Sequence, residues 1–115
     1  MEQVTPSIYN VGAGENIVVE IEATGVGNFA TLAVDGKLIP STPDSNPLSF
    51  ESFPITAGPG LPQFGRVSCH FPDDAPDSAE YRIFLTGDQG GGRFKGANIL
   101  KSDLGWDSGL EFRRR

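Results

Sequence analysis

Apolar and polar residues alternate along much of this chain. The clearest alternating sets are Ile17, Val19, Ile21 and Ala23; Ala30, Leu32 and Val34; Val67, Cys69 and Phe71; and Ala79, Tyr81, Ile83 and Leu85. Alternate side chains of a β-strand point to the same face, so each set predicts a strand with one buried face. No window of helical length carries apolar residues at helical spacing without an interrupting Gly or Pro. The pattern therefore predicts an all-β fold.

Turn residues separate these runs, because fifteen Gly and nine Pro are spread along the chain. Asp35-Gly36 predicts a tight hairpin, since both central positions of a type I′ turn need a positive φ. Further strands are predicted over 37–39, 48–57, 64–71, 94–100 and 110–113, with loops at 40–47, 58–62, 72–78 and 87–92. Pro54 lacks a backbone donor, so strand 48–57 should be kinked or lie at a sheet edge. The total is eight or nine strands.

A length of 115 residues fits one domain, and no repeat or linker divides residues 1–115. Such a chain can bury a core without cross-links. Cys69 is the only cysteine, which leaves no internal disulfide. Many short strands in one domain predict an antiparallel sandwich of two sheets.

A local motif sharpens this prediction. The segment D-S-A-E-Y-R-I contains Asp77, Ala79 and Tyr81 in the pattern Asp-x-Ala-x-Tyr-x-Cys, with Ile83 at the cysteine position. It resembles the entry into strand F of the immunoglobulin-like Greek-key superfamily. The resemblance implies a tyrosine corner, in which Tyr81 buries its ring and donates its hydroxyl to the preceding loop. It implies architecture and no particular activity.

The same resemblance implies a correspondence of strands. Residues 17–23 would be strand B, 67–71 strand E and 94–100 strand G, with 87–92 as the hairpin between F and G. The protein would then be an immunoglobulin-like sandwich without the disulfide that antibody domains carry.

Charge and targeting signals limit the partners. The net charge is −6, which opposes binding to a phosphate backbone, so no nucleic-acid partner is expected. The first residues, Met-Glu-Gln-Val-Thr-Pro, carry no export signal, and no apolar run reaches membrane-spanning length. We expect a soluble protein, and the lone cysteine favours a reducing compartment such as the cytoplasm.

Catalytic chemistry finds little support. Cys69 and His70 are neighbours on a predicted strand, so their side chains point to opposite faces and cannot form a nucleophile–base pair. One cysteine and one histidine fall short of a zinc site. No acidic pair is positioned by a pattern that predicts a buried, pKa-shifted carboxyl. We therefore expect no enzyme activity and no cofactor.

Calcium is a separate case, because oxygen-rich loops can bind it. Asp73, Asp74 and Asp77 lie in one predicted turn, and Asp88 begins another. Their spacing does not match an EF-hand, and aspartate is common in turns because it hydrogen-bonds its own backbone. We expect turn residues and no metal site, with calcium as the alternative.

Two surface features suggest binding. Phe84 should point outward beside Arg82, and an outward aromatic on a strand can mark a protein interface. Trp106, with Asp103 and Asp107, could hold a sugar, the ring stacking and the carboxylates accepting hydrogen bonds; the alternative is that Trp106 anchors the C-terminal segment on the core. The sequence predicts a non-catalytic binding or assembly module acting through protein–protein contacts or self-association. The alternative is a carbohydrate-binding module.

Overall fold

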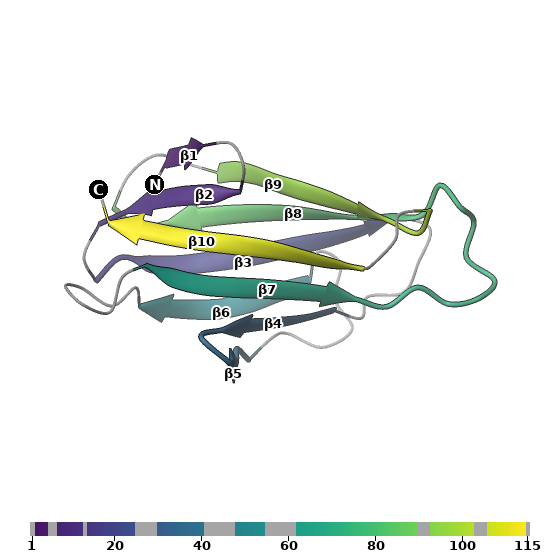
Figure 1. The fold of residues 1–115 in the computed structure, drawn as a ribbon, viewed down its shortest axis with the longest axis horizontal. Helices are drawn as coiled ribbons and strands as arrows, with labels where there is room; N and C mark the ends of the chain where they lie inside the picture. Colours follow the sequence, from purple (N-terminus) through teal and green to yellow (C-terminus); the bar gives the residue numbers. More distant parts are fainter. Residues whose placement is uncertain are drawn as a thin grey trace.

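The computed structural model shows an all-β protein, with ten strands and no helix in the residues that it describes. Those residues are 2–4, 7–12, 14–24, 30–40, 48–54, 62–89, 93–102 and 106–114. This part of the chain therefore holds no helix long and apolar enough to span a bilayer. The molecule measures 45 × 26 × 26 Å, and its longer strands run along the long axis (Figure 1).

The strands form two sheets. They are β1 (Glu2–Val4), β2 (Ile8–Val11), β3 (Asn16–Thr24), β4 (Ala30–Val34), β5 (Lys37–Leu38), β6 (Leu48–Pro54), β7 (Gln63–Cys69), β8 (Glu80–Gly87), β9 (Arg93–Leu100) and β10 (Asp107–Arg114). One sheet has six strands in the order β1-β2-β10-β7-β4-β5, and the other has four in the order β6-β3-β8-β9. Cys69 is a free thiol, so the two sheets form without a disulfide.

Most of the predicted strands are present close to their expected bounds. Pro54 is the last residue of β6, and β6 lies at the edge of the four-stranded sheet, as the missing proline donor requires. Asp35 and Gly36 both have positive φ, at 50° and 81°, which confirms the predicted hairpin turn. The predicted loops at 40–47, 58–62 and 87–92 fall largely outside the described residues.

Three features of the strands differ from the prediction. The strand expected over 110–113 extends over β10 as a whole. β1 and β2 were not predicted, because runs of three and four residues give only a weak alternation signal. β2 also runs parallel to β10, with Ile8 opposite Glu111. The expectation of purely antiparallel sheets is therefore wrong at this pair.

The strand correspondence that the resemblance implied also differs from the observed pairing. In immunoglobulin domains strands B and F lie in opposite sheets. Here β3 and β8, which contain the segments assigned to B and F, are antiparallel neighbours in one sheet, with Ile21 opposite Ile83. The local motif is therefore present in a sheet of different strand order.

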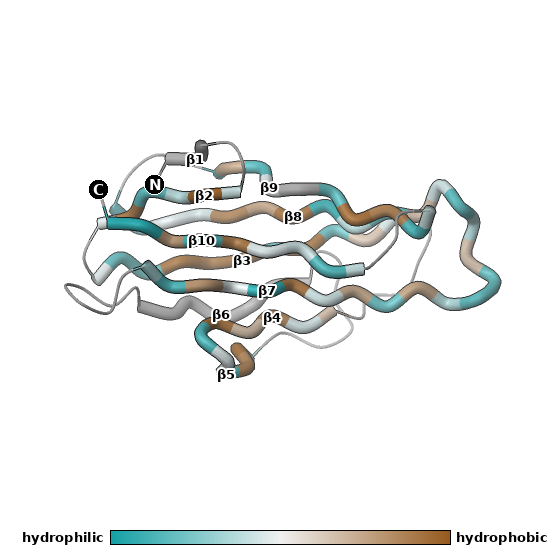
Figure 2. The backbone as a smooth tube through the Cα atoms, in the orientation of Figure 1, coloured by the Kyte–Doolittle hydropathy of each residue, from teal (hydrophilic) through white to brown (hydrophobic). Residues whose placement is uncertain are grey.

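One hydrophobic core receives side chains from both sheets. Its buried apolar members are Tyr9, Val11, Ile17, Val19, Ile21, Ala30, Leu32, Val34, Val67, Cys69, Phe71, Ala79, Tyr81, Ile83, Leu85, Ile99, Leu110 and Phe112. Figure 2 shows apolar and polar residues alternating along strands such as β7. Alternation therefore assigned the buried faces of β3, β4, β7 and β8 correctly.

The predicted tyrosine contact is confirmed. Tyr81 is 1% exposed, and its hydroxyl donates a hydrogen bond of 2.7 Å to the carbonyl oxygen of His70, at the start of the loop before β8. Its ring packs edge-on against Phe71, with centroids 5.2 Å apart. The Nζ of Lys101 also donates to the carbonyls of Asp73 and Ala75 in this loop. The loop is thereby tied to the sheets along its length.

Tyr81→Phe should lower the free energy of unfolding by about 1 kcal/mol, because it removes one hydrogen bond from a buried group and leaves the packing in place. Urea denaturation of both proteins measures this difference. Tyr9→Phe is the matched control, since the buried Tyr9 hydroxyl has no hydrogen-bond partner among the described residues. Equal losses in the two variants would contradict the role given to the Tyr81 hydroxyl.

Candidate functional site

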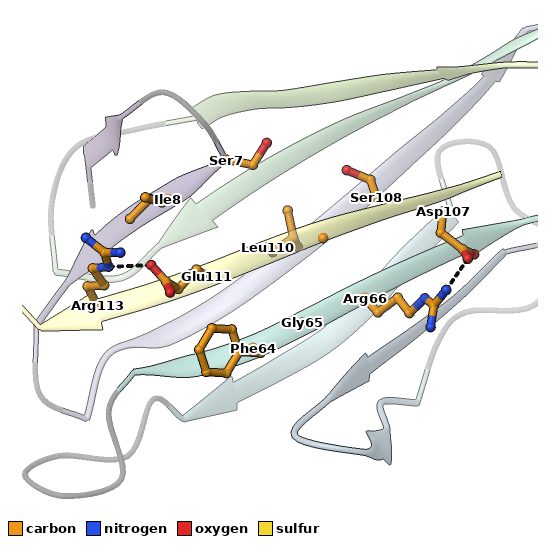
Figure 3. A pocket seen from close by; sticks show the side chains of 11 residues that line it. Ser7, Ile8, Phe64, Gly65, Arg66, Asp107, Ser108, Leu110, Glu111 and Arg113 are labelled. Atoms are coloured by element: carbon orange, nitrogen blue, oxygen red, sulfur yellow. Dashed lines mark hydrogen bonds and ion pairs between the residues drawn. The ribbon is translucent and has the colours of Figure 1, made fainter. Parts of the chain in front are cut away.

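An open groove of about 870 Å³ lies on the six-stranded sheet, on the side turned away from the core. Its lining comes from β10 (107–111 and 113), from β7 (64–66) and from Ser7 and Ile8 at the start of β2. Figure 3 shows most of these side chains along the two neighbouring strands β7 and β10, with Ser7 and Ile8 at β2. The groove is therefore a feature of the sheet surface.

Two columns of side chains form the centre of this surface. On β7 the outward residues are Phe64, Arg66 and Ser68, and on β10 they are Asp107, Gly109 and Glu111. The strand register sets Asp107 opposite Ser68, Gly109 opposite Arg66, and Glu111 opposite Phe64. We call these six residues the β7–β10 face.

The two columns differ in height. The Phe64 side chain is large and the residue is 55% exposed, and the Arg66 side chain is 69% exposed. A Cβ placed on Gly109 would meet no heavy atom of the described residues within 4 Å. β7 thus presents a ridge, and β10 presents a trough with Gly109 at its floor.

The hairpin between β4 and β5, which lies beside β7 in the sheet, holds Phe64 in place. The Asp35 carboxylate accepts hydrogen bonds from the Phe64 amide, at 3.0 Å, and from the Gln63 side-chain amide, at 3.1 Å. The Asp35 amide in turn donates to the Phe64 carbonyl at 2.9 Å. A turn with positive φ therefore fixes the start of the ridge, and Phe64 stays exposed because its position on β7 faces away from the core.

The charges that line the groove are paired. Arg66 donates to Asp107 at 2.5 Å, and Arg113 pairs with Glu111 on the same strand (Figure 3). A hydrogen bond from Ser68, together with the Arg66 guanidinium, holds the pKa of Asp107 below its usual value. These two cations and two anions make the groove neutral, although the whole chain carries a net charge of −6.

The residues predicted as an interface lie on the other sheet. Phe84 is half-buried, and the Arg93 guanidinium carbon sits 3.7 Å from its ring centroid. Arg82 forms an ion pair with Glu80 at 2.7 Å. Phe84 does point away from the core, as predicted, but the Arg93 side chain covers its ring. The interface role of these residues stays a prediction.

Trp106 and Asp107, two of the residues predicted to bind a sugar, point in different directions. Trp106 is 40% exposed, packs edge-on against the buried Phe71 with centroids 5.4 Å apart, and directs its indole Nε1 to the Lys101 carbonyl at 3.4 Å. The Asp107 carboxylate turns instead to Arg66 on the β7–β10 face. Asp103 lies outside the described residues. The contact with Phe71 supports the anchoring alternative, and sugar binding stays a prediction.

The two nucleophile candidates are separated as alternation predicted. Cys69 is buried and His70 is exposed. Burial raises the pKa of the Cys69 thiol to about 12, and the charge of Asp107 adds to the shift. Among the described residues, which include Asp73, Asp74, Asp77 and Asp88, no group of three or more His, Cys, Asp or Glu is placed to hold a metal ion. Asp88 instead accepts hydrogen bonds from the backbone and side-chain amides of Asn16.

Comparison with protein-family models, with characterised proteins and with solved structures finds no match for this chain. The groove therefore has to be interpreted from its own residues. The alternating pattern did not predict the groove, although one signal was present. Phe64 is two residues from Arg66 and four from Ser68, so it is an apolar residue on the polar side of its strand. The trough could not be seen in the same way, because a glycine in a strand gives no alternation signal.

Proposed function

We propose that this protein is a non-catalytic binding or assembly module that contacts another protein through the β7–β10 face. The observation that carries the proposal is that large, exposed apolar side chains lie on this side of the six-stranded sheet. The described residues include three large, exposed apolar side chains, at Leu38, Phe64 and Trp106. Two of them, Leu38 and Phe64, belong to this side of the six-stranded sheet.

The strand register places Leu38 on that side. Leu38 of β5 is opposite Ala33 of β4, and Ala33 is opposite Arg66 of β7. Residues directly opposite in antiparallel strands share a face, so Leu38, which is 73% exposed, lies in the same row as Arg66. Exposed apolar side chains bordered by charged ones are typical of protein interaction sites.

We further propose that the two sheets stack face to face as a sandwich, which would leave this side of the six-stranded sheet free for a partner. Contacts between the sheets support this arrangement. The Tyr9 hydroxyl of β2 lies against Gly96 of β9, and Phe71, next to β7, packs on Tyr81 of β8. The hydrogen bond from Tyr81 to His70 is what the chain shares with immunoglobulin-like sandwiches.

Site-specific cross-linking tests the function. A photoreactive phenylalanine analogue is placed at position 64, and as a matched control at position 84 on the other sheet, in protein produced in its native cells. We expect a protein adduct from position 64 and a much weaker one from position 84. No adduct from position 64 would refute the proposed interface, and an adduct from position 84 alone would favour the Phe84 side.

A further inference from the structure

The β7–β10 face has the shape of a surface that fits a copy of itself. The ridge on β7 consists of Phe64 and Arg66, and the trough on β10 has Gly109 at its floor between Asp107 and Glu111. Ridge and trough are on adjacent strands and run side by side. We propose that two copies of this chain pair through this face, with Arg66 of each copy lying over Gly109 of the other.

The strand register defines how the copies would be related. We consider a two-fold axis that runs parallel to β7 and β10, midway between them. This axis places β7 of one copy over β10 of the second copy without a shift along the strands. Because Arg66 is opposite Gly109 in the strand register, Arg66 of one copy then lies over Gly109 of the second copy. Both contacts then occur twice, as in any isologous interface.

Side-chain sizes favour this arrangement. Packed sheets lie about 10 Å apart, and a layer is filled when large side chains oppose small ones. Arg66 opposite a glycine satisfies this rule in the central row, whereas Arg66 opposite itself would place two cations together. The same axis sets Phe64 over Glu111 and Ser68 over Asp107 in the flanking rows. Sheets in such a pair would be aligned within about 30°.

Charges favour the same arrangement. Over Gly109 of the second copy, the Arg66 guanidinium would lie between the carboxylates of Asp107 and Glu111, which precede and follow that glycine by two residues on the same face. A guanidinium has five N–H donors, so Arg66 can keep its bond to its own Asp107 and also reach the second copy. With Arg113 beside Glu111 counted, the charges of this surface cancel, so a chain of charge −6 meets its copy here across a locally neutral surface.

Sedimentation velocity over a concentration series tests the pairing in the purified full chain. We expect a monomer–dimer equilibrium in the wild-type protein at ~0.15 M salt, where charges more than about 8 Å apart are largely screened. Gly109→Val should weaken the dimer at least tenfold while the fold is kept, because the trough has room for the added carbons and the φ of Gly109 is not positive. Phe64→Ala should weaken it too, and Phe84→Ala should leave it unchanged.

A charge exchange tests the register. In a dimer of Arg66→Glu, the new glutamate at position 66 would meet Glu111 of the other copy. In a dimer of Glu111→Arg, Arg66 would meet the new arginine at position 111. Each variant alone should therefore be monomeric at concentrations where the wild type pairs. An equimolar mixture should form a heterodimer, because position 66 of each chain then faces a charge of opposite sign at position 111 of the other chain. Circular dichroism of each variant shows that the loss of pairing is not a loss of fold.

The proposal is overturned by a wild-type chain that stays monomeric up to about 1 mM, by a dimer that Gly109→Val does not weaken, or by a mixture that stays monomeric. It depends on the proposed function, but the two can fail separately. If position 64 cross-links to a different protein while the purified chain is monomeric, the interface stands and self-pairing is wrong. If position 64 yields an adduct with twice the mass of the chain, both are supported.

Discussion

Ile83→Ala is expected to lower the free energy of unfolding by about 2–5 kcal/mol, the range for large-to-small substitutions in packed cores. Ile83 is fully buried in the middle of β8 and stands opposite Ile21 of β3. It also lies against Gly96 of β9, so the alanine would leave a cavity that three strands border. Such a site cannot collapse easily, because each strand is held by its ladder of hydrogen bonds.

Urea denaturation of both proteins measures this loss. Val18→Ala is the control, because Val18 is half-buried on the opposite side of β3 and its removal leaves no enclosed cavity. We expect it to cost less than about 1 kcal/mol, since only part of its apolar area is out of water. A nearly neutral Ile83→Ala would contradict the assignment of Ile83 to the inward face of β8, and with it the composition of the core.

Gly96→Ala is expected to lower the free energy of unfolding by about 1–3 kcal/mol, the usual cost of overpacking. A Cβ on residue 96 would lie 3.0 Å from the Tyr9 hydroxyl oxygen and 3.3 Å from Cγ2 of Ile83. Tyr9 belongs to the six-stranded sheet and Gly96 to the other. The added methyl group would therefore press the two sheets apart.

The Tyr9 hydroxyl makes this prediction specific. Burial raises its pKa to about 12, and it finds no hydrogen-bond partner in the described part of the chain, so Tyr9→Phe alone should be neutral or slightly stabilising. Because that variant removes the nearest atom, Gly96→Ala should cost less in the Tyr9→Phe background. A double-mutant cycle from urea denaturation measures the coupling. Equal costs in both backgrounds would show that the added methyl group is not crowded by the Tyr9 hydroxyl.

The candidate site shows where alternation stops being informative. Alternate residues of a strand share a face, so Phe64 must lie on the same side as Arg66 and Ser68. The half of the β7–β10 face that β7 supplies was therefore predictable from the sequence. The other half depends on Gly109 standing opposite Arg66, which only the pairing of β7 with β10 establishes. The contact of Arg93 of β9 with the Phe84 ring likewise depends on the pairing of β8 with β9, and alternation along β8 could not predict it.

The N-terminal strands show the same limit in the fold. Tyr9 and Val11 are fully buried, yet β2 is too short for its alternation to stand out. β2 lies between β1 and β10 in the sheet, and it runs parallel to β10, a partner far away in the sequence. A local pattern carries no information about such a pair.

The amino-acid sequence by itself determined the all-β class, the inward faces of the long strands, the tight turn at Asp35-Gly36 and the tie from Tyr81 to the loop before β8. These depend on interactions between residues close in the chain, or on the two faces of a single strand. The tertiary structure decided which strands are neighbours, that β2 and β10 run parallel, and that a ridge lies beside a trough on the six-stranded sheet. Those features depend on register between distant segments, which is set by the packing of the whole core.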